Sequence, residues 1–382
     1  MAPEDSTQAD FLVKIDAILQ ESVAAGVTGL SAAITSARGH WTFVAGVSDL
    51  ESQQPITSTH LFGVGSITKV FTAVVIFQLI EEGKLQLTDT VSQLLDPEIY
   101  RDIDNAAEAN VDLLLSHETG IDNWEDDPTW IKAGRGSKLD PTHKWTKVEP
   151  LDYIRRPRLT APERGKYYYA NTNYELLGFM IEKITQNTAE AEIRRRILEP
   201  LGMEHTFLEG FEEQSQGTMT KRYHFATEEY REAAGINAAF PELQDGKLID
   251  CTASNLSVEW TAGGMVSTPS DLVKFATAIR DGKLLSAESL ATMKMWRPTT
   301  SETSEMGHGL FRMRDSEKHV WLGHFGGVLG FTAALWWKEE GDCVISVLSN
   351  VGVIHSGDVP SSGAHVVIKS KIRELAAQLA AL

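Results

Sequence analysis

The stretch Phe62-Gly63-Val64-Gly65-Ser66-Ile67-Thr68-Lys69 decides how the rest of this 382-residue sequence is interpreted. It starts as a short strand-like segment and leads into the apolar run Val70 to Ile80, which predicts a buried helix that Gly83 ends. Ser66 stands where a helix N-cap side chain is expected. A serine and a lysine three positions apart at a helix start share one face, so we expect the two side chains to meet.

Ser66 and Lys69 form a candidate pair of nucleophile and base. A serine hydroxyl hardly ionises at neutral pH, so it needs a proton acceptor in contact. Lysine can accept the proton only if burial or neighbouring groups lower its pKa from about 10.4. The apolar run after Lys69 supplies such surroundings. Alone, the pattern also fits a capped helix with a surface lysine, so its meaning depends on the rest of the chain.

The elements predicted at the two ends of the chain resemble each other. At the N-terminal end the patterns predict a helix over 10–25 and strands over 30–34 and 41–45. At the C-terminal end they predict a helix over 269–279, strands over 310–313, 319–322, 331–337 and 343–348, and a helix over 366–382. We therefore expect an α+β fold, with one antiparallel sheet built from both ends and flanked by the terminal helices.

Between the two ends, the sequence is mostly helical, with patterns such as 111–116 and 173–185. The predicted division is a discontinuous α/β domain of residues 1–64 and 259–382 and a mostly helical domain of residues 65–258. The active site is expected in the cleft between the two domains.

Two further segments carry groups that can act in chemistry. Tyr167-Tyr168-Tyr169-Ala170-Asn171 precedes a predicted helix, where a phenol and an amide can face a cleft; aromatic packing is the alternative. Gly323-His324-Phe325-Gly326-Gly327 lies between strand-like segments, and its glycines permit a close approach of substrate to backbone N–H groups. A glycine-rich hairpin with a solvated histidine is the alternative there.

In this order, the three segments resemble the serine penicillin-recognising enzymes, in the branch of class C beta-lactamases, D-alanyl-D-alanine carboxypeptidases, D-aminopeptidases and related esterases. The resemblance runs nearly end to end. It also includes Leu114-Leu115-Ser116-His117-Glu118-Thr119-Gly120, Leu177-Gly178, Pro200-Leu201-Gly202-Met203, Gly263-Gly264-Met265-Val266-Ser267-Thr268 and His324 to Phe331. It implies a beta-lactamase/transpeptidase-like fold.

The resemblance also implies roles for individual residues. Ser66 would attack a carbonyl carbon, and Lys69 and Tyr169 would share the proton transfers, with the choice of base left open. The backbone N–H groups of Ser66 and Gly327 would form the oxyanion hole. Asn171 would bind a substrate amide, and His324 would occupy a position where relatives carry lysine or histidine.

Two positions affect the expected substrate in opposite directions. At Phe325 many relatives have a hydroxyl or glycine, and an apolar wall there favours an ester, an amide or a lipophilic acyl group over a substrate with a free carboxylate. Arg312, with Arg314 on the same strand-like segment, resembles a basic cluster that anchors a carboxylate; a solvated sheet edge or a structural ion pair is the favoured alternative. The aromatic residues between 120 and 170 either line the cleft or anchor loops: Trp124, Trp130, Trp145, Tyr167 and Tyr168.

The sequence thus predicts a serine hydrolase that acts through an acyl-enzyme on a small amide, peptide or ester, with a lean to D-amino-acid peptides or amides. A carboxylesterase or acyltransferase and a beta-lactamase are the alternatives within the family. A binding protein that keeps the fold without turnover is the alternative of another class.

Composition narrows the other possibilities. The net charge of −18 disfavours nucleic acid and anionic lipid, and no apolar run approaches the roughly 20 residues that a membrane span needs. Two cysteines and the absence of metal or phosphate-loop motifs predict no disulfide framework, metal or cofactor. The N-terminus shows no signal peptide, which predicts a cytoplasmic location unless the sequence is trimmed. The oligomeric state is not predicted.

Overall fold

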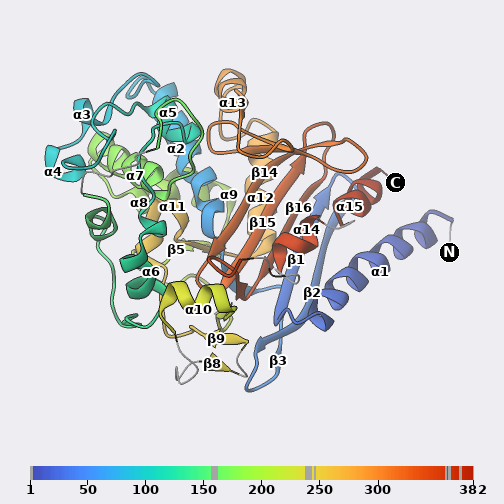
Figure 1. The fold of residues 1–382 in the computed structure, drawn as a ribbon. Coiled ribbons are helices and arrows are strands. Elements are labelled where there is room, and N and C mark those ends of the chain that lie inside the picture. Colours follow the sequence, from blue (N-terminus) through green and yellow to red (C-terminus); the bar gives the residue numbers. More distant parts are fainter. Residues whose placement is uncertain are drawn as a thin grey trace.

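The fold is described from a computed structural model. It covers residues 3–155, 162–236, 243–244, 247–357, 359, 363–369 and 372–381. Figure 1 shows a large central sheet with a group of helices beside it and both chain termini on the opposite side. The α+β fold predicted from the sequence is therefore present.

The helices differ widely in length, and many are single turns. Their bounds are α1 Pro3–Ala24, α2 Thr68–Glu81, α3 Val91–Leu94, α4 Pro97–Tyr100, α5 Val111–Ser116, α6 Pro128–Arg135, α7 Asn171–Thr185, α8 Ala189–Ile193, α9 Glu199–Leu201, α10 Glu228–Ala234, α11 Trp260–Gly263, α12 Pro269–Arg280, α13 Ala287–Met293, α14 Ala364–Lys369 and α15 Ile372–Ala381. Short 3-10 turns include η1 (Gly65–Ile67), η2 (Trp124–Asp126) and η5 (Ser257–Glu259).

The strands are longest at the two ends of the chain. Their bounds are β1 Gly29–Ser36, β2 Gly39–Asp49, β3 Gln54–Pro55, β4 His60–Gly63, β5 Phe207–Leu208, β6 Thr218–Met219, β7 Tyr223–Phe225, β8 Leu243–Gln244, β9 Leu248–Asp250, β10 Met265–Ser267, β11 Arg297–Pro298, β12 Ser304–Met306, β13 Phe311–Arg314, β14 Val320–Val328, β15 Phe331–Lys338, β16 Val344–Ser349 and β17 Val351–Gly352.

One sheet joins the two ends of the chain. Within the described residues it has nine strands in the order β11-β12-β13-β14-β15-β16-β1-β2-β3. The junction is the antiparallel pair of β1 and β16, with Leu30 opposite Ser349 and Thr35 opposite Val344. The N-terminal hairpin and the C-terminal meander therefore form a single sheet, as the sequence predicts, and the helical region is inserted between them. The predicted domain boundaries stay predictions.

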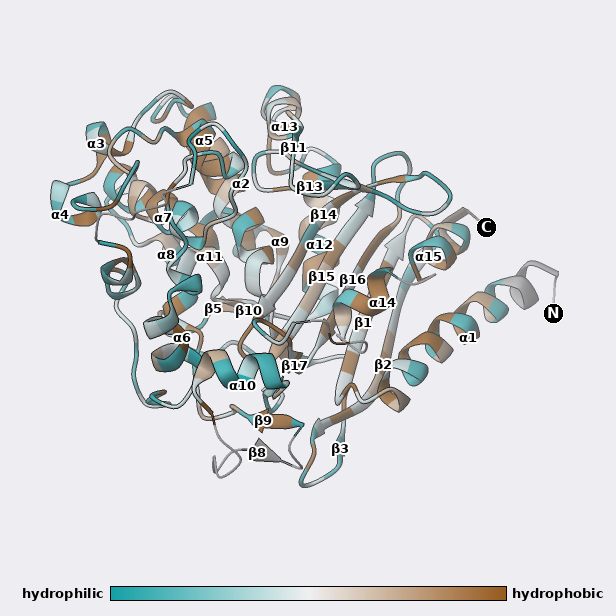
Figure 2. Cartoon of the chain, viewed as in Figure 1, coloured by the Kyte–Doolittle hydropathy of each residue, from teal (hydrophilic) through white to brown (hydrophobic). Residues whose placement is uncertain are grey.

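The sheet is covered on both faces. Helices α1, α14 and α15 pack on one face and bury residues such as Ile15, Val367 and Ile372. Helix α12 packs on the other face against β1, β15 and β16. Figure 2 shows hydrophobic residues along the central strands and on α14, as expected for a sheet buried on both sides.

Helix α2 lies at the centre of the inserted region. Nearly all of its side chains are buried, including Thr68, Lys69 and Thr72, because a helix that is apolar all round needs neighbours on every side. Helices α7, α8 and α11 supply these neighbours. Thr72 Oγ1 donates a hydrogen bond of 2.8 Å to the Thr261 carbonyl, which ties α2 to α11.

Two local predictions are wrong. Ser66 does not cap a helix with its side chain; it lies within the 3-10 turn η1, and α2 begins at Thr68. The glycine-rich segment from Gly323 to Gly327 is part of β14, not a link between strands. In the described residues, the predicted helix over 366–382 corresponds to α14 and α15.

Two observations concern membrane spans and the two cysteines. None of the helices in the described ranges combines the length and apolar character that a membrane crossing requires. Cys251 and Cys343 are both buried and free, so the single bridge that the sequence permits is not formed.

Candidate active site

The turn that carries Ser66 depends on Gly65. Gly65 has φ +53°, in the left-handed region that favours glycine, and a Cβ there would lie 2.6 Å from the backbone nitrogen of Gly327. Thr68 Oγ1 donates to the Gly65 carbonyl at 2.7 Å and accepts from the Met265 N–H at 3.1 Å. The turn is thereby fixed to β10 on one side and held close to β14 on the other.

Strand β14 approaches the same turn through Gly326. A Cβ on Gly326 would lie 1.9 Å from the Val64 carbonyl oxygen, whereas a Cβ on Gly327 would meet the tip of the Ile354 side chain at 2.7 Å. The two glycines thus face opposite sides of the strand. The predicted oxyanion partners, Ser66 and Gly327, are brought together by this close packing of backbones.

Gly326→Ala is expected to lower kcat/KM by about 10²-fold, because β14 must move away from the Ser66 turn and a shift of about 1 Å has that cost. The control is Val13→Ala, at an exposed position of α1 that touches neither β14 nor the Ser66 turn in the contacts described above. Steady-state kinetics of both variants check this. Equal activity of the two variants would contradict the role given to Gly326.

Lys69 is the centre of the buried site. Its Nζ donates to Ser66 Oγ at 3.1 Å, to Asn171 Oδ1 at 2.6 Å and to the Ala262 carbonyl at 2.8 Å. The side chain is fully buried, and Nζ also lies 4.8 Å from the centre of the Tyr169 ring. Ser66, Lys69 and Tyr169, here called the catalytic cluster, are therefore adjacent, as predicted.

The pKa values of Lys69 and Tyr169 shift in opposite directions. Burial lowers the pKa of Lys69 to about 8, and the carboxylates of Glu125, Glu259 and Glu175 limit the decrease. Burial raises the pKa of Tyr169 well above its usual value, and its interaction with Ser66 acts in the opposite direction. Near pH 8 the site therefore contains a lysine that can release its proton and a phenol that keeps its own.

His117 supports the Tyr169 ring from behind. The two rings are stacked with their centres 4.2 Å apart and 25° between their planes. His117 Nδ1 accepts from the Ala170 N–H at 3.2 Å. Burial and the nearby Lys69 keep the pKa of His117 well below its usual value. A neutral imidazole thus packs against the phenol without adding a charge.

Three charged residues that the sequence analysis did not single out lie behind Lys69. Arg135 forms ion pairs with Glu125 and, at 3.1 Å, with Glu259; these three residues are the buried ion network. The side chains of Arg135 and Glu259 are 1% and 4% exposed. Burial raises the pKa of Glu259 to about 7, against the opposing effect of Arg135 and Lys69.

Asn171 links the buried ion network to the catalytic cluster. Its Oδ1 accepts from Lys69 Nζ, and its Nδ2 donates to Glu125 Oε2 at 2.9 Å. Both ends of the amide are engaged, so in this structure Asn171 orients Lys69. The predicted contact of Asn171 with a substrate amide stays a prediction.

Glu175 adds a fourth ionisable group beneath the site. It is buried on α7, and burial together with the Glu259 carboxylate raises its pKa well above the usual value. Burial therefore favours the neutral, protonated form of Glu175. No spacing in the sequence indicates this cluster, because its members come from α6, α7 and the turns η2 and η5.

His324 borders the catalytic cluster on β14. Its ring centre lies 6.3 Å from that of Tyr169 and 4.9 Å from that of Phe311. Nδ1 donates to the Phe325 carbonyl, and burial lowers the pKa of His324 to about 3. His324 is thus a buried neutral imidazole, not the solvated side chain that was the alternative for this segment.

The side chains of Phe325 and Arg312 make structural contacts in place of the predicted substrate contacts. The Phe325 ring packs on the α14 face of the sheet, 5.0 Å from Trp336 and 5.2 Å from His365, because neighbouring residues of a strand face opposite sides. The idea of an apolar wall at Phe325 is therefore wrong. Arg312 pairs with Glu305 and lies over the Trp296 ring, which is the structural alternative considered for it.

The aromatic residues of the 120–170 region mostly stabilise the inserted region. Trp124 and Trp130 are fully buried and pack edge to face with ring centres 4.6 Å apart. Trp145 packs against Tyr153, and the Tyr168 hydroxyl donates to Asp122. Trp124 and Trp130 thus anchor loops, which is one of the two roles considered for them. The Tyr167 ring lies next to the His117 ring.

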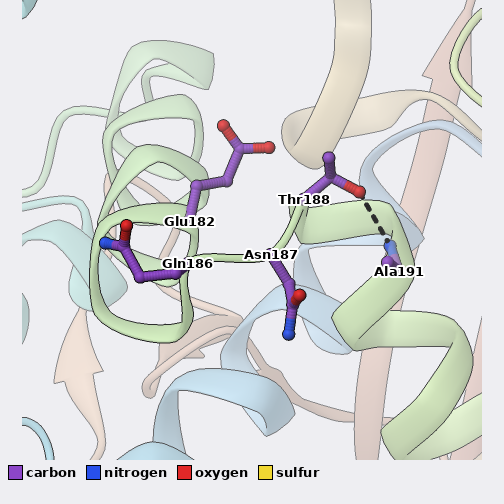
Figure 3. Close-up of a pocket in the computed structure, with 5 residues that line it drawn as sticks. All are labelled: Glu182, Gln186, Asn187, Thr188 and Ala191. Carbon is purple, nitrogen blue, oxygen red and sulfur yellow. Dashed lines mark hydrogen bonds between the residues drawn. The ribbon is translucent and has the colours of Figure 1, made fainter.

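A separate surface depression lies at the end of α7 (Figure 3). It has a volume of about 520 Å³ and is lined by Glu182, Gln186, Asn187, Thr188 and Ala191. Thr188 Oγ1 accepts from the Ala191 N–H to cap α8, and Glu182 pairs with Lys147. Its polar groups thus serve local structure, and the candidate active site is the cluster around Ser66.

Comparisons with known proteins give the family and the fold of this chain. The sequence model of the Beta-lactamase family matches residues 15–359. The D-amino acid amidase from Ochrobactrum anthropi SV3, solved with D-phenylalanine, is 28% identical, with a TM-score of 0.81 over 97% of this chain and 99% of that chain. A D-stereospecific amidohydrolase from Streptomyces sp. is 25% identical, with a TM-score of 0.78 over 94% of this chain and 97% of that one.

Curated sequences give a less complete match. The esterase EstB of Burkholderia gladioli is 24% identical over 301 residues, which are 74% of each chain. This chain spans only 32%, 63% and 44% of the lengths of three other curated relatives.

Proposed function

This chain belongs to the Beta-lactamase family, and from that premise we propose that it is a serine hydrolase that cleaves an amide or ester through an acyl-enzyme on Ser66. The observation that carries the proposal is the contact of 3.1 Å between Lys69 Nζ and Ser66 Oγ inside a buried site. A lysine in that position with a pKa of about 8 can serve as a base.

Acylation follows from the two opposite pKa shifts. Ser66 Oγ forms a bond to the substrate carbonyl carbon as neutral Lys69 takes the hydroxyl proton. The bond from that carbon to the leaving nitrogen or oxygen then breaks, and the leaving group takes up a proton from Tyr169. Lys69 returns its proton to Tyr169, so the amine or alcohol departs and the enzyme keeps no net proton.

Deacylation uses the same groups in reverse. Water attacks the acyl carbon, the bond to Ser66 Oγ breaks, and the acid is released while Ser66 regains its proton. In both steps the carbonyl oxygen becomes negative, and backbone N–H groups aimed at that oxygen stabilise it. The close approach of Gly65 and Gly327 supports Ser66 and Gly327 as these donors.

We favour an amide of a D-amino acid as the substrate. Two relatives whose printed names describe D-specific amide hydrolysis match nearly the whole chain. Burial keeps His324 neutral and Arg312 is paired with Glu305, so neither of these two described residues is an unpaired cation for a substrate carboxylate. This arrangement favours an amide over a C-terminal D-alanine peptide or a beta-lactam.

A carboxylesterase or acyltransferase is the second candidate, and the similarity to EstB supports it. Esters react through the same acyl-enzyme, and transfer differs only in the acceptor that reaches it. The predicted cytoplasmic location stays a prediction.

A matched substrate panel tests the proposal: D-phenylalanine amide, its L-enantiomer, p-nitrophenyl butyrate and nitrocefin, with Ser66→Ala as the blank. The favoured result is a D-selective amide rate that disappears in the blank. Ester turnover alone would replace the amidase with the second candidate. A folded wild type that turns over none of the four would support a binding protein instead.

The pH dependence should show the lowered pKa of Lys69. Below about pH 8 the amine is protonated and cannot accept the Ser66 proton, so kcat/KM is expected to rise with pH and reach half its maximum near pH 8. The apparent pKa belongs to the group of coupled side chains rather than to Lys69 alone. A pH-rate profile measures it, and constant activity from about pH 6 to pH 10 would contradict the assignment of Lys69 as base.

A further inference from the structure

The helix behind the active-site strand contains a histidine that the proposed mechanism does not use. His365, in α14, is the neighbour of Phe325 on the sheet face opposite the catalytic cluster. Its Nε2 lies 2.7 Å from the Gly326 carbonyl oxygen. A carbonyl oxygen can only accept, so Nε2 carries the proton and donates it to this bond.

We propose that His365 is a positioning residue that sets the oxyanion hole by holding the Gly326–Gly327 peptide from behind; this rests on the proposed function. The Gly326 carbonyl and the Gly327 N–H belong to one planar trans peptide and point in opposite directions. A donor on the carbonyl side therefore fixes the direction of the N–H on the other side. It also polarises the peptide and makes the N–H a better donor.

The other side of this peptide faces the nucleophile. A Cβ on Gly65, the residue before Ser66, would lie 2.6 Å from the Gly327 nitrogen. The Gly327 nitrogen thus lies against the turn that carries Ser66, while His365 donates to the carbonyl at the other end of the same peptide. Gly326 and Gly327 are also paired with Ala333 and Thr332 of β15, so the bond from His365 adds to the restraint that the sheet supplies.

The surroundings keep His365 in place and uncharged. The Ala364 N–H donates to Thr332 Oγ1 at 3.1 Å, which attaches the start of α14 to β15. The Phe325 ring packs edge to face on the imidazole at 5.2 Å. Burial, and secondarily Lys369 on the same helix, lower the pKa of His365 to about 4. Phe325 therefore contributes to the site indirectly, as the packing partner of His365.

Three variants at one position test this inference. His365→Phe keeps a ring against Phe325 and removes the donor, His365→Gln restores a side-chain N–H, and His365→Leu repeats the removal with a smaller side chain. Val366→Ala, on an exposed position of the same helix, is the matched control. The measurements are kcat and KM on the best substrate of the panel, the affinity for a boronic acid that forms a tetrahedral adduct on Ser66, and the melting temperature.

We expect His365→Phe and His365→Leu to lower kcat about 10-fold and to leave KM within about 2-fold of the wild-type value. Removal of a whole oxyanion donor lowers kcat about 10²- to 10³-fold, and the effect here is smaller because His365 acts through the peptide. Boronate affinity should fall by the same factor, and His365→Gln should recover most of both. Wild-type kcat and boronate affinity in both donor-free variants would overturn the inference, as would equal losses in His365→Gln. Failure of the proposed function looks different, because the wild type itself would then show neither turnover nor boronate binding.

Discussion

Lys69→Met should lower kcat/KM by about 10³-fold or more, at the upper part of the range for losing a general base. Methionine has a similar length and fills the buried space, but it cannot accept the Ser66 proton. The three acceptors that Lys69 Nζ contacts, on Ser66, Asn171 and Ala262, then lose their shared donor. Steady-state kinetics on the best substrate of the panel measures the loss.

Two opposite effects act on the stability of the same variant. The buried acceptors on Asn171 and Ala262 lose their donor, which destabilises the folded state. The pKa of Lys69 is lowered from 10.5 to about 8 on folding, so protonation of Lys69 favours unfolding below pH 10.5, fully so below about pH 8, and methionine removes that cost. Lys84→Met, at an exposed lysine that pairs with Glu82, is the matched control and should keep full activity. A Lys69→Met enzyme with wild-type kcat/KM would exclude Lys69 as the base.

Arg135→Met should destabilise the folded state by about 3 to 5 kcal/mol, the range for breaking a buried ion pair from one side. The guanidinium is nearly inaccessible and lies between the carboxylates of Glu125 and Glu259. Without it, two buried carboxylates face each other with only Lys69 nearby. Urea unfolding of the variant measures the change in the free energy of unfolding.

The loss in the free energy of unfolding caused by Arg135→Met should grow as the pH rises. Loss of the cation raises the folded-state pKa of Glu259 further above its unfolded value, from about 7 in the wild type. A carboxyl with a raised pKa is neutral and tolerated at low pH, and its stabilising protonation is lost as the pH rises through the folded pKa. Arg164→Met, which breaks an exposed pair with Glu108, should cost about 1 kcal/mol or less at any pH. A loss of stability in Arg135→Met as small as that in Arg164→Met would contradict the stabilising role given to the buried ion network.

The parts of the site that the sequence predicts correctly are local or belong to family motifs. Ser66 and Lys69 are three residues apart, so the geometry of a helix start brings them together whatever the rest of the chain does. Tyr169 is a hundred residues further on, and only the resemblance placed it beside Lys69. The sheet built from both ends was predictable because strand and helix patterns at the two ends are complementary.

The errors have physical causes. The predicted N-cap at Ser66 fails because left-handed Gly65 opens a 3-10 turn before the helix. Gly323, Gly326 and Gly327 interrupt the side-chain alternation that indicates a strand, yet the segment is part of β14. Glycine at 326 leaves room for the Val64 carbonyl to approach the strand backbone. The orientation of Phe325 could have been predicted, because once His324 faces the catalytic cluster its neighbour in a strand must face away.

The buried ion network could not be predicted from the sequence. Glu125 and Arg135 are ten residues apart, and Arg135 and Glu259 are 124 apart. No periodicity connects them, and charged residues in loops are ordinarily solvated. Only the folded chain shows that Glu125 and Glu259 lie close enough to Lys69 to limit how far its pKa falls.

The intact mass of the protein after incubation with a fluorophosphonate tests most directly whether Ser66 is the nucleophile, because an activated serine displaces fluoride and becomes phosphonylated. We predict a single adduct on the wild type, located on Ser66 by peptide mass spectrometry, absent in Ser66→Ala and much slower to form in Lys69→Met. A folded wild type that acquires no adduct, or an adduct that persists in Ser66→Ala, would contradict the claim that Ser66 is the nucleophile.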